Sequence, residues 1–277
     1  MRQNCKCMLS KFLADARRLV VITGAGCSTQ SGIPDYRNPG GAWTRHKPMY
    51  YNDFVRSEEN RRVYWARSFC GWPRFVAARP NAAHHALAEL ESRGLIDFLI
   101  TQNVDDLHQE AGSTKLVQLH GRNRVVVCLD CRAEFSRAEI QNRLAALNPG
   151  VTRDASYDFQ IAPCDRCGGV LKPDVVFFGE NVPAAKVALA MQQVDEADAL
   201  LVVGSSLSVW SGFRFVKRAS EKNLPIAILN LGPTRGDELA SLKIEDECGA
   251  ALTAAIRTAP TIRSLVPSGS HSALDRS

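Results

Sequence analysis

Five short apolar runs divide the chain, and each ends in small or polar residues. They lie at residues 18–26, 96–103, 172–180, 199–206 and 225–230. Apolar runs of this length without alternation are typical of strands buried on both faces, as in a parallel sheet. We therefore predict that all five runs are strands of a parallel sheet.

Helical patterns lie between these runs. Residues 81–94 begin at Asn81, a residue type favoured at helix N-caps, and end at Gly94. Residues 183–198 and 212–223 follow the third and fourth runs. The alternation predicts an α/β fold with a doubly wound, Rossmann-like parallel sheet, in which ligands bind beyond the C-terminal ends of the strands.

Two insertions interrupt the alternation. Residues 37–80 contain a Pro/Gly loop and a helical stretch, and residues 125–170 contain two cysteine pairs. We expect the insertions to form one smaller zinc-binding and helical domain. The larger domain then comprises residues 1–36, 81–124 and 171–257, and the Ser-rich stretch 258–277 is expected to be a disordered tail.

Composition narrows the class of protein. The chain has 277 residues, 45% hydrophobic and 23% charged, as is usual for a globular protein. The net charge of +5 is spread over scattered Lys and Arg residues, which argues against a nucleic-acid partner, and no apolar run approaches a membrane span. Nine cysteines, four of them in two pairs, suit a reducing compartment, so we expect a cytoplasmic protein. The oligomeric state stays open.

Two Cys-x-x-Cys pairs predict a metal site. Cys128, Cys131, Cys164 and Cys167 supply four thiolates on two tight turns, the ligand set that Zn²⁺ accepts in a tetrahedron. Four protein ligands leave no position for a catalytic water, so this zinc is expected to be structural. His120 precedes the first pair by eight positions and is not needed as a ligand.

The stretch TGAGCSTQSG (23–32) follows the first run and is typical of a loop that holds phosphates. Gly24 and Gly26 allow backbone N–H groups to approach phosphate oxygens. Thr29 stands where a dehydrogenase fingerprint requires its third glycine, which argues against a dehydrogenase. The segment GIPDYR follows and brings Asp35 and Arg37 beside this loop.

Polar residues follow other runs at TQNVDDLH (101–108), GSS (204–206) and NLG (230–232). Asn and Asp also favour turns, so capping alone is the alternative explanation of Gln102, Asn103 and Asp105. Several polar strand ends together favour a binding site at one edge of the sheet.

Taken in order, the motifs GAGCSTQSGIPDYR, TQNVDDLH, QLHG, the cysteine pairs, VVFFGE, GSSL and ILN resemble those of the sirtuins, a family of NAD-dependent protein deacylases. The resemblance extends from about Arg17 to Leu252. RRVYWARSFCGWPRF (61–75) is similar to the class II branch, which includes the fourth human sirtuin, and the short N-terminus suggests a bacterial relative. Cys27 and Tyr36 depart from the usual aliphatic residue and Phe.

The resemblance implies that NAD is bound as a consumed co-substrate. The residues that match the family's NAD contacts are Gly24, Ala25, Gly26, Ser28, Asp35, Tyr36, Arg37, Gln102, Asn103, Val104, Asp105, Gly204, Ser205, Ser206, Asn230, Leu231, Gly232 and Cys248.

The resemblance also assigns catalytic and peptide-binding roles. His120 matches the catalytic histidine, a base that takes a proton from a ribose hydroxyl, and Asn103 is the second catalytic position. An acyl-lysine protein or peptide is expected to add as a strand along Val176, Phe177, Phe178, Gly179 and Glu180. The expected products are nicotinamide and O-acyl-ADP-ribose.

Tyr64 and Arg67 bear on the acyl group. They lie three residues apart, hence on one face of a helix, and resemble a Tyr-x-x-Arg of the desuccinylating branch. A phenol and a guanidinium can hold the carboxylate of a dicarboxylic acyl chain. A packed tyrosine and a solvated arginine explain the pair equally well.

Two other functions remain open at this point. A mono-ADP-ribosyltransferase would share the release of nicotinamide, and an NAD-sensing binding protein would need no base. The presence of Asn103, Asp105 and His120 favours deacylation over both.

Overall fold

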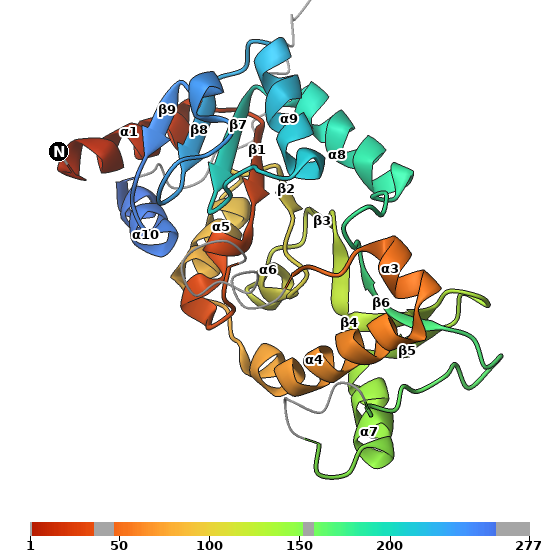
Figure 1. Ribbon diagram of the computed structural model, residues 1–277. Coiled ribbons are helices and arrows are strands. Elements are labelled where there is room, and N and C mark those ends of the chain that lie inside the picture. Colours follow the sequence, from red (N-terminus) through yellow and green to blue (C-terminus); the bar gives the residue numbers. More distant parts are fainter. Residues whose placement is uncertain (1, 36–46, 152–157, 259–277) are drawn as a thin grey trace, which may run out of the picture.

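A six-stranded parallel sheet forms the centre of the larger domain (Figure 1). The computed structural model describes residues 2–35, 47–151 and 158–258. The strands lie in the order β3 (Leu116–Gln118), β2 (Phe98–Thr101), β1 (Leu19–Thr23), β7 (Ala199–Val203), β8 (Ile226–Leu229) and β9 (Leu242–Ile244). Strand order reverses between β1 and β7, and open α/β sheets bind ligands at such a switch point.

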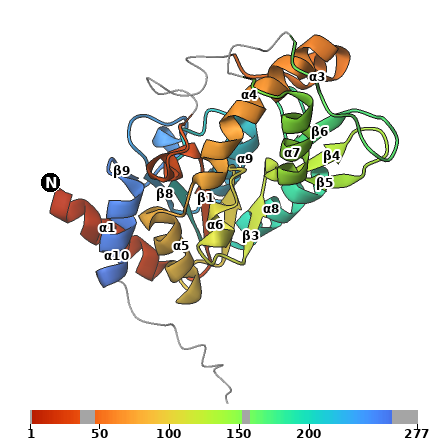
Figure 2. The same cartoon turned by 90° about the horizontal axis from the view of Figure 1, so that it is seen from below.

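Helices cover both faces of this sheet (Figures 1 and 2). On one face lie α1 (Arg2–Asp15), α5 (Ala82–Ser92) and α10 (Cys248–Thr258), and on the other α8 (Ala184–Glu196) and α9 (Trp210–Glu221). In β1, Leu19 and Val21 belong to the first core and Val20 and Ile22 to the second. Because successive side chains of a strand point to opposite faces, a strand covered on both sides must be apolar throughout.

The start of α5 confirms the N-cap predicted at Asn81. The Asn81 side chain accepts a hydrogen bond from the backbone N–H of Ala83 at 2.8 Å, and His84 Nδ1 accepts the N–H of Asn81 at 3.2 Å. This reciprocal capping box satisfies backbone donors that a helix start leaves unpaired. Gly94 follows the helix with a φ of 70°.

The smaller domain contains a three-stranded antiparallel sheet, in the order β5 (Glu134–Ser136), β4 (Gly121–Cys128) and β6 (Leu171–Val175). Helices α3 (Tyr51–Arg56), α4 (Glu58–Ala77) and α7 (Arg137–Leu147) pack with it around Phe54, Trp65 and Phe159. The placement of residues 172–180 in the parallel sheet was therefore wrong, since β6 pairs with β4. An apolar run indicates burial but not the partner strand.

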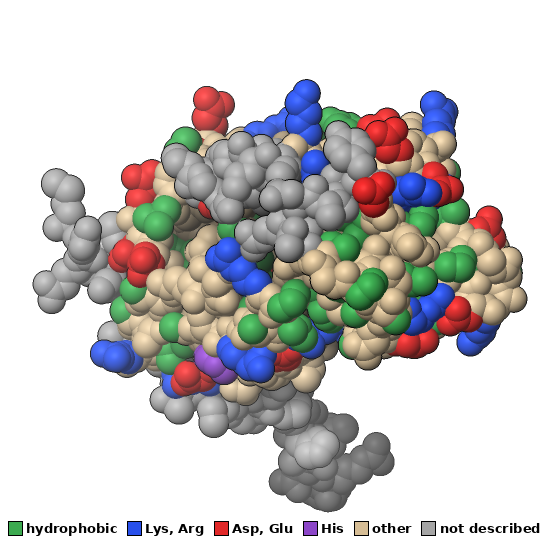
Figure 3. Space-filling view, turned by 60° about the horizontal axis from the view of Figure 1, so that its bottom comes forward, with side chains coloured by type: hydrophobic (Ala, Val, Ile, Leu, Met, Phe, Trp, Pro, Cys, Tyr) green, Lys and Arg blue, Asp and Glu red, His purple; other side chains and the backbone are tan. Residues whose placement is uncertain are grey.

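Short helical elements lie in the loops that follow the strands: η1 (Ala25–Cys27), η2 (Thr29–Ser31), α6 (Leu107–Glu110) and η3 (Asp237–Leu239). Within the described ranges, no helix has both the length and the apolar character needed to cross a membrane. Acidic and basic side chains are interspersed on the face shown in Figure 3.

Candidate active site and zinc site

A cavity of about 760 Å³ lies at the C-terminal ends of β1, β2, β7 and β8 and reaches into the smaller domain. Its lining includes most of the predicted site residues: Gly24, Ala25, Gly26, Asp35, Tyr64, Gln102, Asn103, Val104, His120, Val176, Phe177, Phe178, Gly179, Glu180, Gly204, Ser205, Ser206, Asn230, Leu231, Gly232 and Cys248. Ser28 and Asp105 are buried behind this lining. Tyr36 and Arg37 lie outside the described residues.

Three glycines allow two loops to meet at the switch point. Gly26 donates its N–H to the carbonyl of Gly204 at 2.8 Å. A Cβ on Gly26 would lie 2.9 Å from that oxygen, and one on Gly24 would lie 2.7 Å from Cβ of Ser205. Gly204 has a φ of 60°, and a Cβ there would overlap the backbone of Cys27. Such a cradle, which side chains would fill, fits the diphosphate of NAD.

Behind the cradle, buried hydrogen bonds fix the amide of Asn103. Its Nδ2 donates to the carbonyl of Gly24 at 3.1 Å and to Ser28 Oγ at 3.0 Å. Ser28 in turn donates to Asp105 Oδ2 at 2.7 Å, and Leu107 N–H donates to Asp105 Oδ1 at 3.0 Å. Burial raises the pKa of Asp105, and these donors oppose the rise. Ser28 and Asp105 therefore support Asn103 from behind.

The imidazole of His120 has a defined tautomer. Its Nδ1 lies 3.0 Å from the carbonyl oxygen of Gln102, which can only accept, so Nδ1 carries the proton. Its Nε2 lies 2.7 Å from Ser211 Oγ. The surrounding protein removes most water from the ring, and this desolvation lowers the pKa of His120 to about 4. Near neutral pH the ring is uncharged, with a lone pair on Nε2.

Two further imidazoles, those of His84 and His108, lie near the cavity with ring centroids 4.8 Å apart and the Cys27 thiol beside them. Burial lowers the pKa of His84 to about 4 and that of His108 to about 3. His84 Nδ1 accepts the N–H of Asn81, so Nε2 carries the proton and has no lone pair for a metal. The pair is therefore a neutral part of the core.

The segment after β6 is held to the rest of the site by its backbone. Val176 N–H donates to the carbonyl of His120 at 2.9 Å, and Phe178 carbonyl accepts from Tyr51 N–H at 2.9 Å. Lys172 is buried and pairs with Glu180 at 2.9 Å, while Glu180 accepts the N–H of Phe177 at 2.8 Å. The ion pair therefore fixes the shape of residues 176–180.

Only one of the two residues considered for the acyl group reaches the cavity. Tyr64 lines it and packs against Phe54 and Phe177 at centroid distances of 5.4 and 5.0 Å. Arg67, one turn further along α4, is exposed and is not part of the lining. Spacing of three residues places side chains on one face of a helix, but it does not place both in the same pocket.

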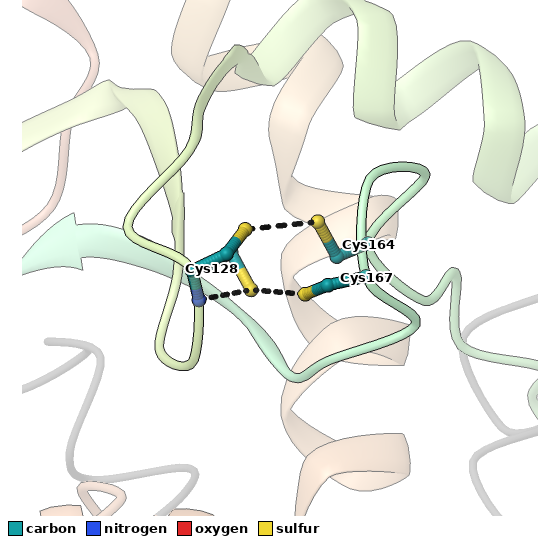
Figure 4. Close-up of side chains that lie close together, drawn as sticks. Cys128, Cys164 and Cys167 are labelled. Atoms are coloured by element: carbon teal, nitrogen blue, oxygen red, sulfur yellow. Dashed lines mark hydrogen bonds between the residues drawn. The ribbon is translucent and has the colours of Figure 1, made fainter.

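The four predicted metal ligands converge in the smaller domain (Figure 4). The Sγ atoms of Cys128 and Cys167 are 3.5 Å apart, and those of Cys131 and Cys164 are 3.7 Å apart. A tetrahedron with Zn–S bonds of about 2.3 Å has S–S edges of about 3.8 Å. The donor set and its spacing fit a structural Zn²⁺.

Ser211 and Lys172 were not predicted as site residues from the sequence. Ser211 lies in the first turn of α9, and Gly212 beside it has no room for a side chain because Gln102 occupies that space. The sequence signal was limited to a serine and a glycine following the GSSL motif, and only the packing of α9 against Gln102 brings Ser211 to His120.

Comparison with known proteins identifies the family. A model of the Sir2 family matches residues 24–211. The chain belongs to the Sir2 family. This Sir2 family member is 52% identical over 259 residues to "NAD-dependent protein deacetylase" of Xanthomonas axonopodis pv. citri (strain 306), covering 88% of each chain. It is 49% identical over 259 residues to human "NAD-dependent protein lipoamidase sirtuin-4, mitochondrial", covering 87% of this chain and 82% of the relative.

Solved structures agree with this assignment. One described as "Sir2-p53 peptide-NAD+" is similar with a TM-score of 0.78 and 31% identity, over 90% of this chain and 96% of that one. Similarity to bacterial deacetylases and to sirtuin-4 confirms the expected class II relationship.

Proposed function

We propose that this Sir2 family member is an NAD-dependent protein-lysine deacylase that releases nicotinamide and O-acyl-ADP-ribose. The observation that carries the proposal is the neutral His120, whose Nε2 has a lone pair and which lines the same cavity as the glycine cradle and residues 176–180. The names of the relatives, NAD-dependent deacetylases and a lipoamidase, support it.

The cradle of Gly24, Ala25 and Gly26 would hold the diphosphate of NAD, facing Gly204 and Ser205. When bound, NAD supplies the sugar that receives the acyl group, with nicotinamide as the leaving group. Gln102 orients His120 through its carbonyl, and His120 takes up a proton at Nε2. Asn103 is held by Ser28 and Asp105 so that its amide borders the cavity.

The acyl-lysine chain would enter along residues 176–180. An extended peptide that joins a strand-like segment gains backbone hydrogen bonds with little regard for its own sequence. The Lys172–Glu180 pair keeps this segment in shape. We propose acyl-lysine proteins as substrates on this basis.

We assign the zinc a structural role, because Cys128, Cys131, Cys164 and Cys167 fill a tetrahedral coordination sphere. The two insertions predicted from the sequence would then fold as the smaller domain around it. Four reduced thiolates are best kept in a reducing compartment, so we also propose a cytoplasmic location.

The test is to incubate the protein with NAD and acyl-lysine peptides that carry acetyl, succinyl, glutaryl or lipoyl groups, and to identify the products by mass. We expect deacylated peptide and O-acyl-ADP-ribose. A His120→Ala variant should fold and bind NAD, but its deacylation rate should fall by a factor on the order of 10²–10⁴. Transfer of ADP-ribose to protein without deacylation would favour the transferase, and NAD binding without turnover would favour a sensor.

A further inference from the structure

The hydroxyl of Ser211 occupies the lone pair on Nε2 of His120, the atom that would take a proton from the substrate. Near neutral pH, Nε2 of His120 has one lone pair and no proton, so the hydroxyl of Ser211 must donate to it. Their separation of 2.7 Å is that of a well-formed hydrogen bond. A substrate hydroxyl therefore reaches Nε2 only by displacing Ser211 or by acting through it.

The serine is held firmly at this position. It lies in the first turn of the twelve-residue helix α9, and that turn packs on Gln102, which fills the space where Gly212 lacks a side chain. Gln102 holds the other side of the same imidazole through its carbonyl. Both contacts of the ring are therefore tied to Gln102, which accepts from Nδ1 and packs against the turn that carries Ser211.

We propose that Ser211 is a proton relay through which His120 acts on the reacting hydroxyl of the substrate. Ser211 lines the cavity, so its oxygen borders the space in which the substrate binds. As the substrate O–H bond breaks, its proton passes to Ser211 Oγ, and the proton of Ser211 passes to Nε2 of His120. The serine ends as it began, and the positive charge resides on the imidazolium.

The nearby ammonium of Lys186 opposes a positive charge on His120, so a partner that stabilises the imidazolium matters here. Lys186 on α8 is half-buried, and its ammonium lowers the pKa of His120 further. A hydroxyl can donate to the neutral ring and, after rotating, accept from the imidazolium, and a hydrogen bond to a charged group is the stronger of the two. Ser211 is thus suited to stabilise His120 as the ring becomes charged.

The inference rests on the proposed deacylase function, so its test separates the two. Nicotinamide exchange from NAD and an acyl peptide reports the step before the base is needed, and formation of deacylated peptide reports the step after it. We expect Ser211→Ala to retain exchange and to slow deacylation on the order of 10- to 100-fold, less than loss of the base itself. Ser211→Thr, which keeps a hydroxyl, should recover most of the rate.

A readout without NAD completes the test. In ¹⁵N NMR spectra of the ligand-free protein, His120 should show a protonated Nδ1, and in Ser211→Ala its Nε2 resonance should move toward that of an unbonded imidazole nitrogen. Ser220→Ala, at the far end of α9, is the matched control and should change neither the spectrum nor the rates. An unchanged Nε2 resonance, or full deacylation by Ser211→Ala, would overturn the relay. Absence of exchange in the unaltered protein would instead overturn the proposed function.

Discussion

Gly26 and Gly204 touch through their backbones, with the N–H of Gly26 2.8 Å from the carbonyl oxygen of Gly204. This contact joins the loop after β1 to the loop after β7, on the two sides of the switch point. A side chain on either glycine would separate the loops. The candidate NAD site therefore depends on the absence of side chains as well as on polar groups.

Gly204→Ala should impair NAD binding and stability together. The added Cβ overlaps the backbone of Cys27, and the φ of 60° is unfavourable for alanine, so we expect a loss of about 2–4 kcal/mol in the free energy of unfolding. Gly94→Ala is the control, because its φ of 70° carries the same strain but nothing lies within 4 Å of the new Cβ. Calorimetric NAD titration and chemical unfolding measure both effects. Equal behaviour of the two variants would mean that the close approach is unimportant.

The zinc site should contain one Zn²⁺ per chain and contribute to folding. Replacing Cys164 by serine removes a buried ligand, so we expect loss of the metal and a lower unfolding temperature for the smaller domain. Cys7→Ser, which changes an exposed thiol outside the cluster, should keep both metal and stability. Elemental analysis and thermal unfolding are the measurements. Well under one zinc per chain in the unaltered protein would contradict the assignment.

Stability should fall in mildly acidic solution. His84, His108 and His120 have pKa values of about 4, about 3 and about 4 in the folded chain, each lowered first by burial. Between their unfolded pKa of about 6.5 and these values, the unfolded chain binds more protons, so stability decreases as pH falls. Each histidine contributes a slope of about 1.4 kcal/mol per pH unit.

Urea unfolding between pH 7 and pH 5 measures this slope. A stability that stays flat over this range would show that the buried imidazoles titrate normally.

Two variants test whether Tyr64 or Arg67 determines which acyl group is preferred. Tyr64 lines the cavity and Arg67 is exposed, so we expect Tyr64→Phe to change the ratio of succinyl to acetyl turnover more than Arg67→Met does. Kinetics on paired peptides give the ratio, and retained secondary structure confirms folding. A selective loss of dicarboxylic substrates in Arg67→Met would instead support the original hypothesis that Arg67 holds their carboxylate.

Much of the site was predictable because its polar residues directly follow the predicted strands. Asn103, Ser205 and Asn230 follow buried parallel strands, and in this fold such ends meet at one edge. The metal site was predictable from the spacing of its cysteines. Ser211 was not, because its approach to His120 depends on how α9 packs against Gln102.

The strands, like the site residues, were predictable only where the local sequence has a clear pattern. Strands β1, β2, β7 and β8 were expected from their apolar runs, whereas the three-residue strands β3 and β9 are too short to give a periodic pattern. The run 172–180 was predicted to join the parallel sheet, but the strand that forms there, β6, pairs with β4, since partner choice is decided by distant segments.

Gly121 marks the point at which the chain passes from the base into the sheet of the smaller domain. Its φ is 85°, and a Cβ there would overlap the carbonyl of Asp174, so the chain turns sharply into β4 directly after His120. The same sheet continues to Cys128 and the zinc ligands. The backbone carbonyl of His120 accepts from Val176 N–H beside β6, whereas its imidazole is held by Gln102 and by Ser211 of α9. The orientation of the base is therefore decided on the larger domain, although the backbone that carries it continues into the zinc-bearing sheet.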